Sequence, residues 1–284
     1  MEFSTVICKA VSKLLPVPQH PFNMQNEGKD TYAEWQYKRG QDTIRFYLDK
    51  TSKEEMFKDK IVLDIGCGAA GKTLYYASQG VRKIYGMDVV EWYEDEANAL
   101  ARQKGMEHLF QFVLGDAARM EFEDNFFDTI IMNDAMEHVD KPLAVLKECY
   151  RVLKPGSRLY INFPPYYHPY GAHLSDAIGF PWIHVFFSDQ TLIKVYKDLV
   201  KDLPDGNKRI SFRISTDETG REYFSYINKM TIKKFCSLLE QVEFDIYYYN
   251  EVPLRSFLKP LCRIPFLKEG FVKMVVCILE KPKN

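Results

Sequence analysis

The 284-residue sequence lacks several features that would assign it to a specialised class of protein. Its six cysteines contain no C-x-x-C pair, which argues against a zinc knuckle and favours reduced thiols in the cytoplasm over a disulfide framework. Its 38 basic and 39 acidic residues leave a net charge of −1, so long nucleic acid is not an expected partner. Internal repeats and low-complexity tracts are also missing.

No stretch of the sequence is apolar for long enough to predict a transmembrane segment. The apolar residues 3–17 are interrupted by Lys9 and Lys13 and end among prolines, a pattern that fits neither a signal peptide nor an anchor. This stretch and residues 254–267 could each form a short amphipathic helix. For both segments, peripheral contact with a membrane and ordinary packing against the protein are the two alternatives.

Short β-branched runs alternate with helical stretches in the middle of the chain, which predicts an α/β fold. We expect a Rossmann-like, seven-stranded, mostly parallel sheet with helices on both faces. The expected strands are residues 61–65, 83–88, 110–114, 129–133, 158–163, 244–249 and 271–279.

The same pattern predicts four parts along the chain. These are an N-terminal helical segment (1–57), a core (58–163), a cap inserted after the fifth strand (164–230) and a C-terminal completion of the sheet (231–284). A long segment that interrupts a regular α/β rhythm is often functional, and this one is rich in aromatic and histidine side chains. Such a composition suits a pocket for an amphipathic small molecule, although core packing explains the aromatic residues about as well.

The most specific feature is residues 61–73, IVLDIGCGAAGKT, an apolar strand that runs into a glycine-rich turn and a helix. Gly66, Gly68 and Gly71 match the G-x-G-x-x-G pattern of dinucleotide enzymes. Together with Lys72 and Thr73 they also match the phosphate loop G-x-x-x-x-G-K-T. The turn alone does not decide between these interpretations.

The carboxylate of Asp64 argues against a phosphate ligand, because its charge would lie beside the polyanion that such a loop holds. A cationic cofactor such as S-adenosylmethionine removes that conflict. The run VLDIGCGAAG resembles the first motif of class I S-adenosylmethionine-dependent methyltransferases. Asp88, after the second strand, is similar to the acid that binds the ribose in that family, and Asp116 is similar to the acid that binds the adenine amino group.

The resemblance extends over residues 61–163 and implies an enzyme that binds S-adenosylmethionine and releases S-adenosylhomocysteine. Tyr37 or Arg39, before the core, could reach the carboxylate of the cofactor. The residues assigned to cofactor binding are Asp64, Gly66, Cys67, Gly68, Asp88, Val89, Asp116, Ala117, Asn133 and Arg39.

The segment Asp134-Ala-Met-Glu-His138 follows the fourth strand and is expected to face the transferred methyl group. His138 is the leading candidate for the catalytic base, and a cap histidine, His173 in particular, is the second candidate. Asp134, Glu137 and His138 also form a D-x-x-E-H pattern that resembles the E-x-x-E-H metal site of some O-methyltransferases. A divalent ion at these three residues is a further hypothesis, with the last ligand supplied by a cap histidine.

The sequence therefore predicts a methyltransferase for a small-molecule acceptor or a glycan- or lipid-linked one, a sugar included, with transfer to oxygen. Two other classes stay open. One is an enzyme that binds a nucleotide, either a phosphate-loop enzyme or a dinucleotide oxidoreductase. Lys72 would be essential in a phosphate-loop enzyme, whereas in a methyltransferase it only begins a helix. The other is a methyltransferase-like interaction protein without catalytic activity.

Overall fold

A computed structural model describes residues 2–26, 30–265 and 267–283 of the chain. The chain forms two compact units, and each is described by itself. The sheet unit consists of residues 30–163, 233–252 and 274–284. The insertion unit consists of residues 1–29, 164–232 and 253–273.

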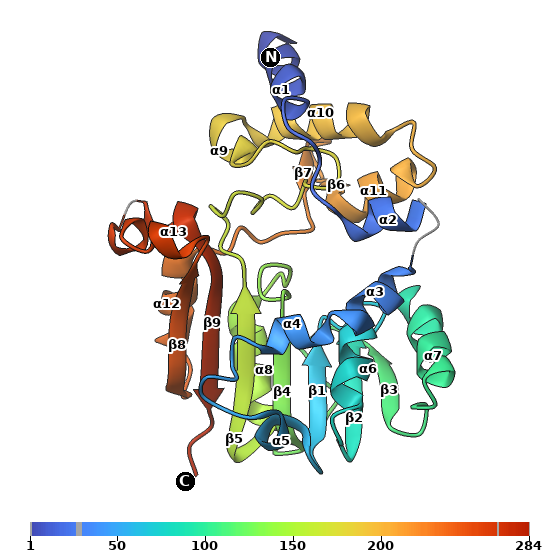
Figure 1. The fold of residues 1–284 in the computed structure, drawn as a ribbon, viewed down its shortest axis with the longest axis vertical. Helices are drawn as coiled ribbons and strands as arrows, with labels where there is room; N and C mark the ends of the chain where they lie inside the picture. The colour runs from blue at the N-terminus through green and yellow to red at the C-terminus, as the bar shows by residue number, and fades with distance from the viewer. Residues whose placement is uncertain (1, 27–29, 266, 284) are drawn as a thin grey trace. The chain divides into compact units, whose positions relative to one another are not determined.

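The sheet unit contains a seven-stranded sheet in the order β3-β2-β1-β4-β5-β9-β8 (Figure 1). Strands β1 to β5 are parallel, whereas β9 runs antiparallel to β5. The expected α/β fold and its seven strands are thus confirmed. The strands are β1 (Ile61–Ile65), β2 (Lys83–Asp88), β3 (Phe110–Leu114), β4 (Phe127–Asn133), β5 (Leu153–Phe163), β8 (Asp245–Pro253) and β9 (Val272–Glu280).

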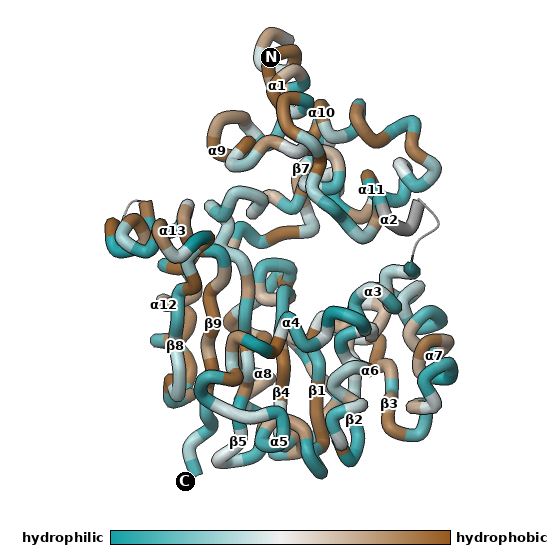
Figure 2. The backbone as a smooth tube through the Cα atoms, viewed as in Figure 1, coloured by the Kyte–Doolittle hydropathy of each residue, from teal (hydrophilic) through white to brown (hydrophobic). Residues whose placement is uncertain are grey.

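Helices cover both faces of this sheet, which explains why its central strands are largely apolar and buried (Figures 1 and 2). Val62, Leu63 and Ile130, for example, are inaccessible to solvent. The helices of the sheet unit are α3 (Tyr32–Lys38), α4 (Gly40–Ile44), α5 (Lys53–Phe57), α6 (Gly71–Ala77), α7 (Tyr93–Gln103), α8 (Pro142–Val152) and α12 (Ile232–Leu239).

The insertion unit has its own apolar core, formed by buried residues such as Cys8, Leu192 and Tyr196. Its strands β6 (Ile214–Thr216) and β7 (Glu222–Phe224) form an antiparallel pair. Its helices are α1 (Glu2–Ser12), α2 (Pro21–Asn26), α9 (Ile183–Phe186), α10 (Asp189–Val200), α11 (Gly206–Arg213) and α13 (Lys268–Phe271), with the short 3-10 helices η1 (Ser256–Leu258) and η2 (Leu261–Arg263). Within the described residues, no helix is long and apolar enough to cross a membrane.

These units differ from the expected division of the chain in two places. The N-terminal segment is split, because α1 packs against α10 of the insertion unit whereas α3 packs against α6 of the sheet unit. The contact of α3 with α6 is so close that a Cβ atom on Gly71 would lie 2.1 Å from the carbonyl oxygen of Ala33. Residues 253–273, expected to complete the sheet, mostly group with the insertion. Both differences depend on contacts between segments far apart in the sequence.

Candidate cofactor and acceptor site

The glycine loop connects the carboxyl end of β1 to α6, and its glycines serve different purposes. A Cβ atom on Gly66 would lie 2.6 Å from the Cβ atom of Ala135, so this glycine lets the segment after β4 approach the loop. Gly68 has a φ of +53°, and a Cβ atom there would meet nothing closer than the Tyr32 ring, at 3.6 Å. Gly68 is buried and has the Tyr32 ring beside it, whereas Gly66 is exposed, so Gly66 is the glycine of this pair whose backbone a ligand can approach.

Asp88, at the end of β2, is fixed to this loop by hydrogen bonds. Its carboxylate accepts the backbone N–H of Gly68 at 2.8 Å and that of Val90 at 3.0 Å. Burial raises the pKa of Asp88, and these backbone donors oppose the rise. Each carboxylate oxygen keeps a further lone pair, so the group can still accept two hydroxyl donors. The neighbouring Val89 is 67% exposed.

Asp116 follows β3, beside the end of β2. The parallel register pairs Asp88 with Leu114, and the N–H of Gly115 donates to the carbonyl of Asp88 at 3.0 Å. The exposed carboxylate of Asp116 accepts the N–H of Ala118 at 2.8 Å. Ala117, which follows Asp116 in the chain, is buried. The structure thus brings two of the predicted cofactor acids to the same edge of the sheet.

Asp64 and Cys67 lie inside the loop. The Asp64 carboxyl is 4% exposed and accepts the Thr73 hydroxyl at 2.5 Å. Burial raises the pKa of Asp64 to about 7, although the Thr73 hydroxyl and the Lys72 ammonium oppose it. Near neutral pH this acid is therefore only partly ionised, and its charge excludes phosphate less strongly than the sequence argument supposed. Burial also raises the pKa of the Cys67 thiol, which indicates packing rather than reactivity.

Lys72 does more than begin a helix, which corrects the prediction from the sequence. Its ammonium donates to the Asp134 carboxylate at 2.7 Å, and the Lys72 side chain is only 17% exposed. Burial lowers the pKa of Lys72, but the Asp134 carboxylate outweighs this effect, so the pKa is raised overall. A phosphate loop needs its lysine directed at the nucleotide. Here an acid on the neighbouring strand end holds that lysine.

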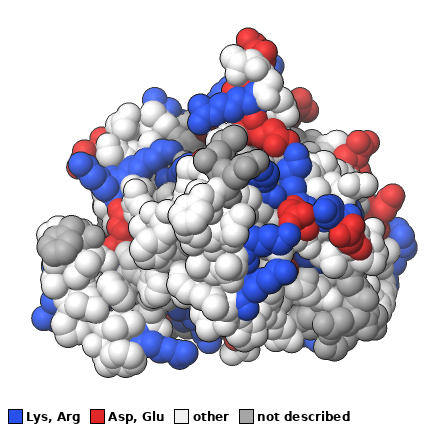
Figure 3. All heavy atoms as spheres, turned by 90° about the horizontal axis from the view of Figure 1, so that it is seen from above, with Lys and Arg blue, Asp and Glu red and all other residues white. Residues whose placement is uncertain are grey.

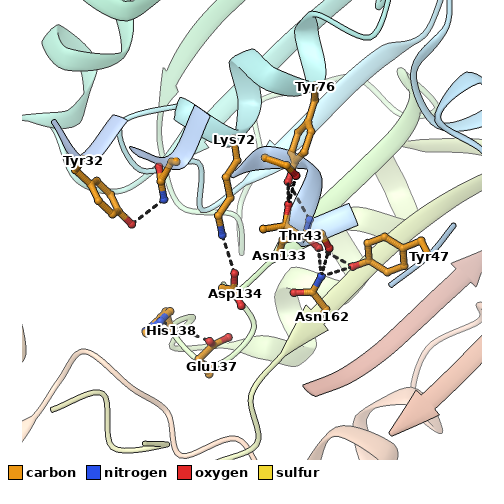
Figure 4. A network of polar contacts seen from close by, with 12 residues as sticks. Tyr32, Thr43, Tyr47, Lys72, Tyr76, Asn133, Asp134, Glu137, His138 and Asn162 are labelled. Carbon is orange, nitrogen blue, oxygen red and sulfur yellow. Dashed lines mark hydrogen bonds and ion pairs between the residues drawn. The ribbon is translucent and has the colours of Figure 1, made fainter. Parts of the chain in front are cut away.

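Asn133 ends β4 and belongs to a buried polar network (Figure 4). Its side-chain oxygen accepts from the Tyr47 hydroxyl at 2.6 Å and from the Asn162 amide at 2.7 Å. Its own amide donates to the Tyr76 hydroxyl at 3.0 Å. The side chain predicted to contact the cofactor therefore joins β4, β5 and the helices over them.

Tyr32 is a site residue that sequence reasoning missed. It begins α3, its ring lies beside Gly68, and its hydroxyl accepts the Gln36 amide at 2.8 Å. Burial raises the pKa of the Tyr32 hydroxyl, and the nearby carboxylates of Asp134 and Asp88 raise it further. The hydroxyl therefore stays protonated and can donate to an anionic group of a ligand.

Arg39 and Tyr37, the residues proposed to reach the cofactor carboxylate, have other contacts. The exposed Arg39 guanidinium forms an ion pair with Asp42, with Nε and Oδ2 3.3 Å apart. The Tyr37 ring lies edge-on to Tyr75, with 6.4 Å between centroids, and receives the Lys104 ammonium at 4.6 Å. A role of Arg39 in cofactor binding stays a prediction.

The segment after β4 does not gather its three predicted metal ligands. Asp134 has a φ of +52° and points to Lys72, whereas Glu137 and His138 lie together beyond it (Figure 4). The Nε2 atom of His138 is 3.7 Å from an oxygen of Glu137. Burial raises the pKa of Glu137 well above its ordinary value, and the charge of Asp134 adds to the rise. A metal at Asp134, Glu137 and His138 does not fit, because an ammonium already neutralises the first of the three.

His173 belongs to the insertion unit, so it and His138 lie in separate compact units. Its backbone has a φ of +55°, and its carbonyl accepts from the guanidinium of Arg213 at 3.1 Å. The other cap histidines are also buried to a large extent, and burial lowers the pKa of His168 to about 4. The catalytic role of His173 stays a prediction.

Comparisons with known proteins support the interpretation of the loop. Residues 63–161 match the sequence model of the family described as "Methyltransferase domain". The chain is 32% identical to tocopherol O-methyltransferase of Arabidopsis thaliana over 130 residues. The aligned stretch covers 46% of this chain and 37% of the relative. It is 38% identical over 99 residues to sterol 24-C-methyltransferase erg-4 of Neurospora crassa, covering 35% of this chain and 26% of that protein.

The match therefore spans about a third of the length of these curated relatives. A putative sarcosine dimethylglycine methyltransferase from Galdieria sulphuraria has a similar fold, with a TM-score of 0.56 and 16% identity over 92% of this chain and 97% of that one. At this identity the likeness shows the fold alone. The glycine loop, the two acids and the family match agree, and residues 63–161 are identified as a methyltransferase domain with the fold of the class I S-adenosylmethionine-dependent enzymes.

Proposed function

We propose that the protein transfers a methyl group from S-adenosylmethionine to an oxygen atom of a small, largely apolar acceptor. The observation that carries the proposal is the glycine loop at the carboxyl end of β1, where Gly66 is exposed and the Gly68 N–H donates to the Asp88 carboxylate at the end of the adjacent strand. Ligands of open α/β sheets bind at this edge. The relatives are named for tocopherol and sterols, which favours a lipophilic ring over a sugar as the acceptor. A cytoplasmic location stays a prediction from cysteine usage.

The residues at the loop fit this cofactor. The exposed backbone of Gly66 suits the methionyl part, and the free lone pairs of Asp88 suit two ribose hydroxyls. Asp116 lies beside Asp88 and suits an amino group. The carboxylates of Asp88 and Asp116 attract a cation and disfavour a polyphosphate. When bound, the cofactor supplies an electrophilic methyl group.

Glu137 and His138 would handle the proton of the acceptor. Burial raises the pKa of Glu137, which favours its protonated carboxyl over the carboxylate and suits it to donate a hydrogen bond. His138 is the better acceptor of a proton from a hydroxyl, and its Nε2 atom lies close enough to Glu137 for the pair to be oriented together.

The cofactor assignment is tested by calorimetry with the purified protein. S-adenosylhomocysteine is expected to bind with a micromolar Kd, whereas ATP with magnesium and NAD are expected not to bind. Asp88→Ala should weaken binding by about tenfold or more, because it removes hydrogen bonds to a charged acceptor. The exposed acid Glu91 is close in sequence, so Glu91→Gln is a matched control that should bind normally. Tight binding of ATP instead would overturn the proposal.

The role of His138 is tested by turnover with tocopherol-class phenols and sterols as acceptors. His138→Gln should lower kcat by about 10²-fold or more, as expected for loss of a general base, and leave the Kd for S-adenosylhomocysteine unchanged. The exposed His108 provides a control, since His108→Gln should behave like the wild type. Wild-type turnover in the His138 variant would refute the base assignment without affecting the cofactor assignment.

A further inference from the structure

Helix α1 of the insertion unit carries its apolar side chains on the outside. Phe3, Val6 and Ile7 are 79%, 67% and 40% exposed, and Leu14, directly beyond the helix, is 68% exposed. The spacing of three and four residues places them on one stripe. Figure 2 shows the hydrophobic residues of this helix. A helix on a water-exposed surface would turn this stripe toward the protein.

The opposite stripe of α1 faces the protein, and it is the more polar of the two. Cys8 and Ser12 are buried, and the Ser12 hydroxyl donates to the carbonyl of Cys8 at 2.7 Å. The Ser4 hydroxyl is 3.4 Å from that of Thr191 in α10. These polar contacts fix the rotation of α1, so its apolar stripe stays outside.

The exposed apolar surface continues onto α9. Val185 and Phe186 of this helix are 52% and 69% exposed. They precede the start of α10, and Thr191 in the first turn of α10 contacts α1 through Ser4. The apolar residues of α1 and α9 therefore belong to neighbouring parts of one unit.

Residues 254–268 provide positive charge next to α9. This segment, LRSFLKPLCRIPFLK, contains four basic residues and no acidic one. Arg255, Lys259 and Arg263 are exposed, and Phe257 between them is 78% exposed. Just beyond this segment, the carbonyl of Gly270 accepts the indole N–H of Trp182, the residue that immediately precedes α9, at 3.2 Å.

We propose that these residues form a docking face for the surface of a bilayer that contains anionic lipids. The docking face consists of Phe3, Val6, Ile7, Leu14, Val185, Phe186 and Phe257 with Arg255, Lys259 and Arg263. Exposed apolar side chains enter the boundary between headgroups and acyl chains, and adjacent basic residues bind anionic headgroups. Figure 3 shows that charged and uncharged side chains both reach the surface in this view.

Charge complementarity favours a membrane over a second copy of the chain as the occupant. Two copies joined through this face would bring like charges together, because residues 254–268 include basic but no acidic residues. An anionic lipid surface instead gains about 1 kcal/mol for each basic residue near it, which corresponds to about fivefold in binding per residue.

Co-sedimentation with vesicles tests the proposal, and the readout does not depend on activity. The full chain is expected to sediment with vesicles of phosphatidylcholine with about 30% phosphatidylglycerol and much less with phosphatidylcholine alone. The triple variant Phe3→Ser, Phe186→Ser, Phe257→Ser should lose at least tenfold in partitioning. The variant Arg255→Gln, Lys259→Gln, Arg263→Gln should lose the preference for the anionic lipid.

The control is Ile246→Ser in β8 of the sheet unit, where the side chain is 55% exposed and should have no effect on vesicle binding. All changed positions are exposed, and an unchanged thermal unfolding midpoint verifies that the variants are folded. Absence of vesicle binding would overturn the proposal. So would equal binding of the two triple variants and the wild type. Sedimentation velocity that reveals a dimer lost in the phenylalanine variant, without vesicle binding, would assign the face to self-association instead.

Discussion

Replacing Asp176 by alanine is expected to lower the free energy of unfolding of the insertion unit by about 3–5 kcal/mol, the usual cost of removing one partner of a buried ion pair. Asp176 is 3% exposed and lies between two buried arginines. One carboxylate oxygen is 3.1 Å from Nη1 of Arg209, and the other is 3.2 Å from Nη2 of Arg213. The variant would leave both guanidinium groups buried without this carboxylate, while Arg209 keeps its ion pair with Asp205.

This cluster also holds together segments far apart in the chain. The Tyr196 hydroxyl of α10 donates to Asp176 at 2.9 Å, and Arg209 donates to the side-chain oxygen of Asn23 in α2 at 2.8 Å. The loss of Asp176 should therefore affect α2, α10 and α11 together. A smaller change is the matched control: Tyr196→Phe removes one hydrogen bond and should cost about 1 kcal/mol.

Urea unfolding followed by the fluorescence of Trp182 isolates the insertion unit. Trp35 and Trp92, the other two tryptophans, both belong to the sheet unit and can be replaced by phenylalanine. In that background, Asp176→Ala should shift the unfolding midpoint to much lower urea than Tyr196→Phe. A loss of less than 1 kcal/mol would show that the arginines find other partners, and the ion-pair argument would fail.

The sequence predicts the sheet because its signals are local. Each strand of the core is a short apolar run of its own, and the glycine turn directly follows the first of them. Asp88 and Asp116 could be placed as well, since parallel strands bring their carboxyl ends to one edge of the sheet. The sequence predicts that Tyr32 lies at the start of a helix, but not that it lies in the site. The Thr31-x-x-Glu34 capping box marks the start of its helix, but not the surface on which that helix packs.

Pairings over long separations could not be predicted. Lys72 and Asp134 are 62 residues apart, and neither motif indicates that one neutralises the other. Arg209 is 33 residues from Asp176, in a segment whose charges could equally have faced solvent. The assignment of residues 1–29 to the insertion unit depends on contacts of the same kind. These are tertiary contacts, and no periodicity or turn signal in the sequence records them.

The second large effect is a pH dependence of stability that originates at Asp64. Burial raises its pKa to about 7 in the folded protein, against 3.8 as the ordinary value. Between these two values the unfolded chain releases a proton that the folded protein keeps, so unfolding becomes easier as the pH rises. A difference of about three pKa units corresponds to about 4 kcal/mol, which is lost progressively from pH 4 to pH 7 and no further above that.

The variant Asp64→Asn should remove this dependence, because its amide has a similar shape, can still accept the Thr73 hydroxyl and does not titrate. At pH 8 we expect the variant to be more stable than the wild type by up to about 4 kcal/mol, and at pH 4 we expect no difference. Urea unfolding between pH 4 and pH 8 measures both, and the exposed Asp140→Asn is the control. Parallel profiles for wild type and Asp64→Asn would show that Asp64 is ionised over this whole range. Its charge would then be a permanent barrier to phosphate at the glycine loop, as the sequence alone suggested.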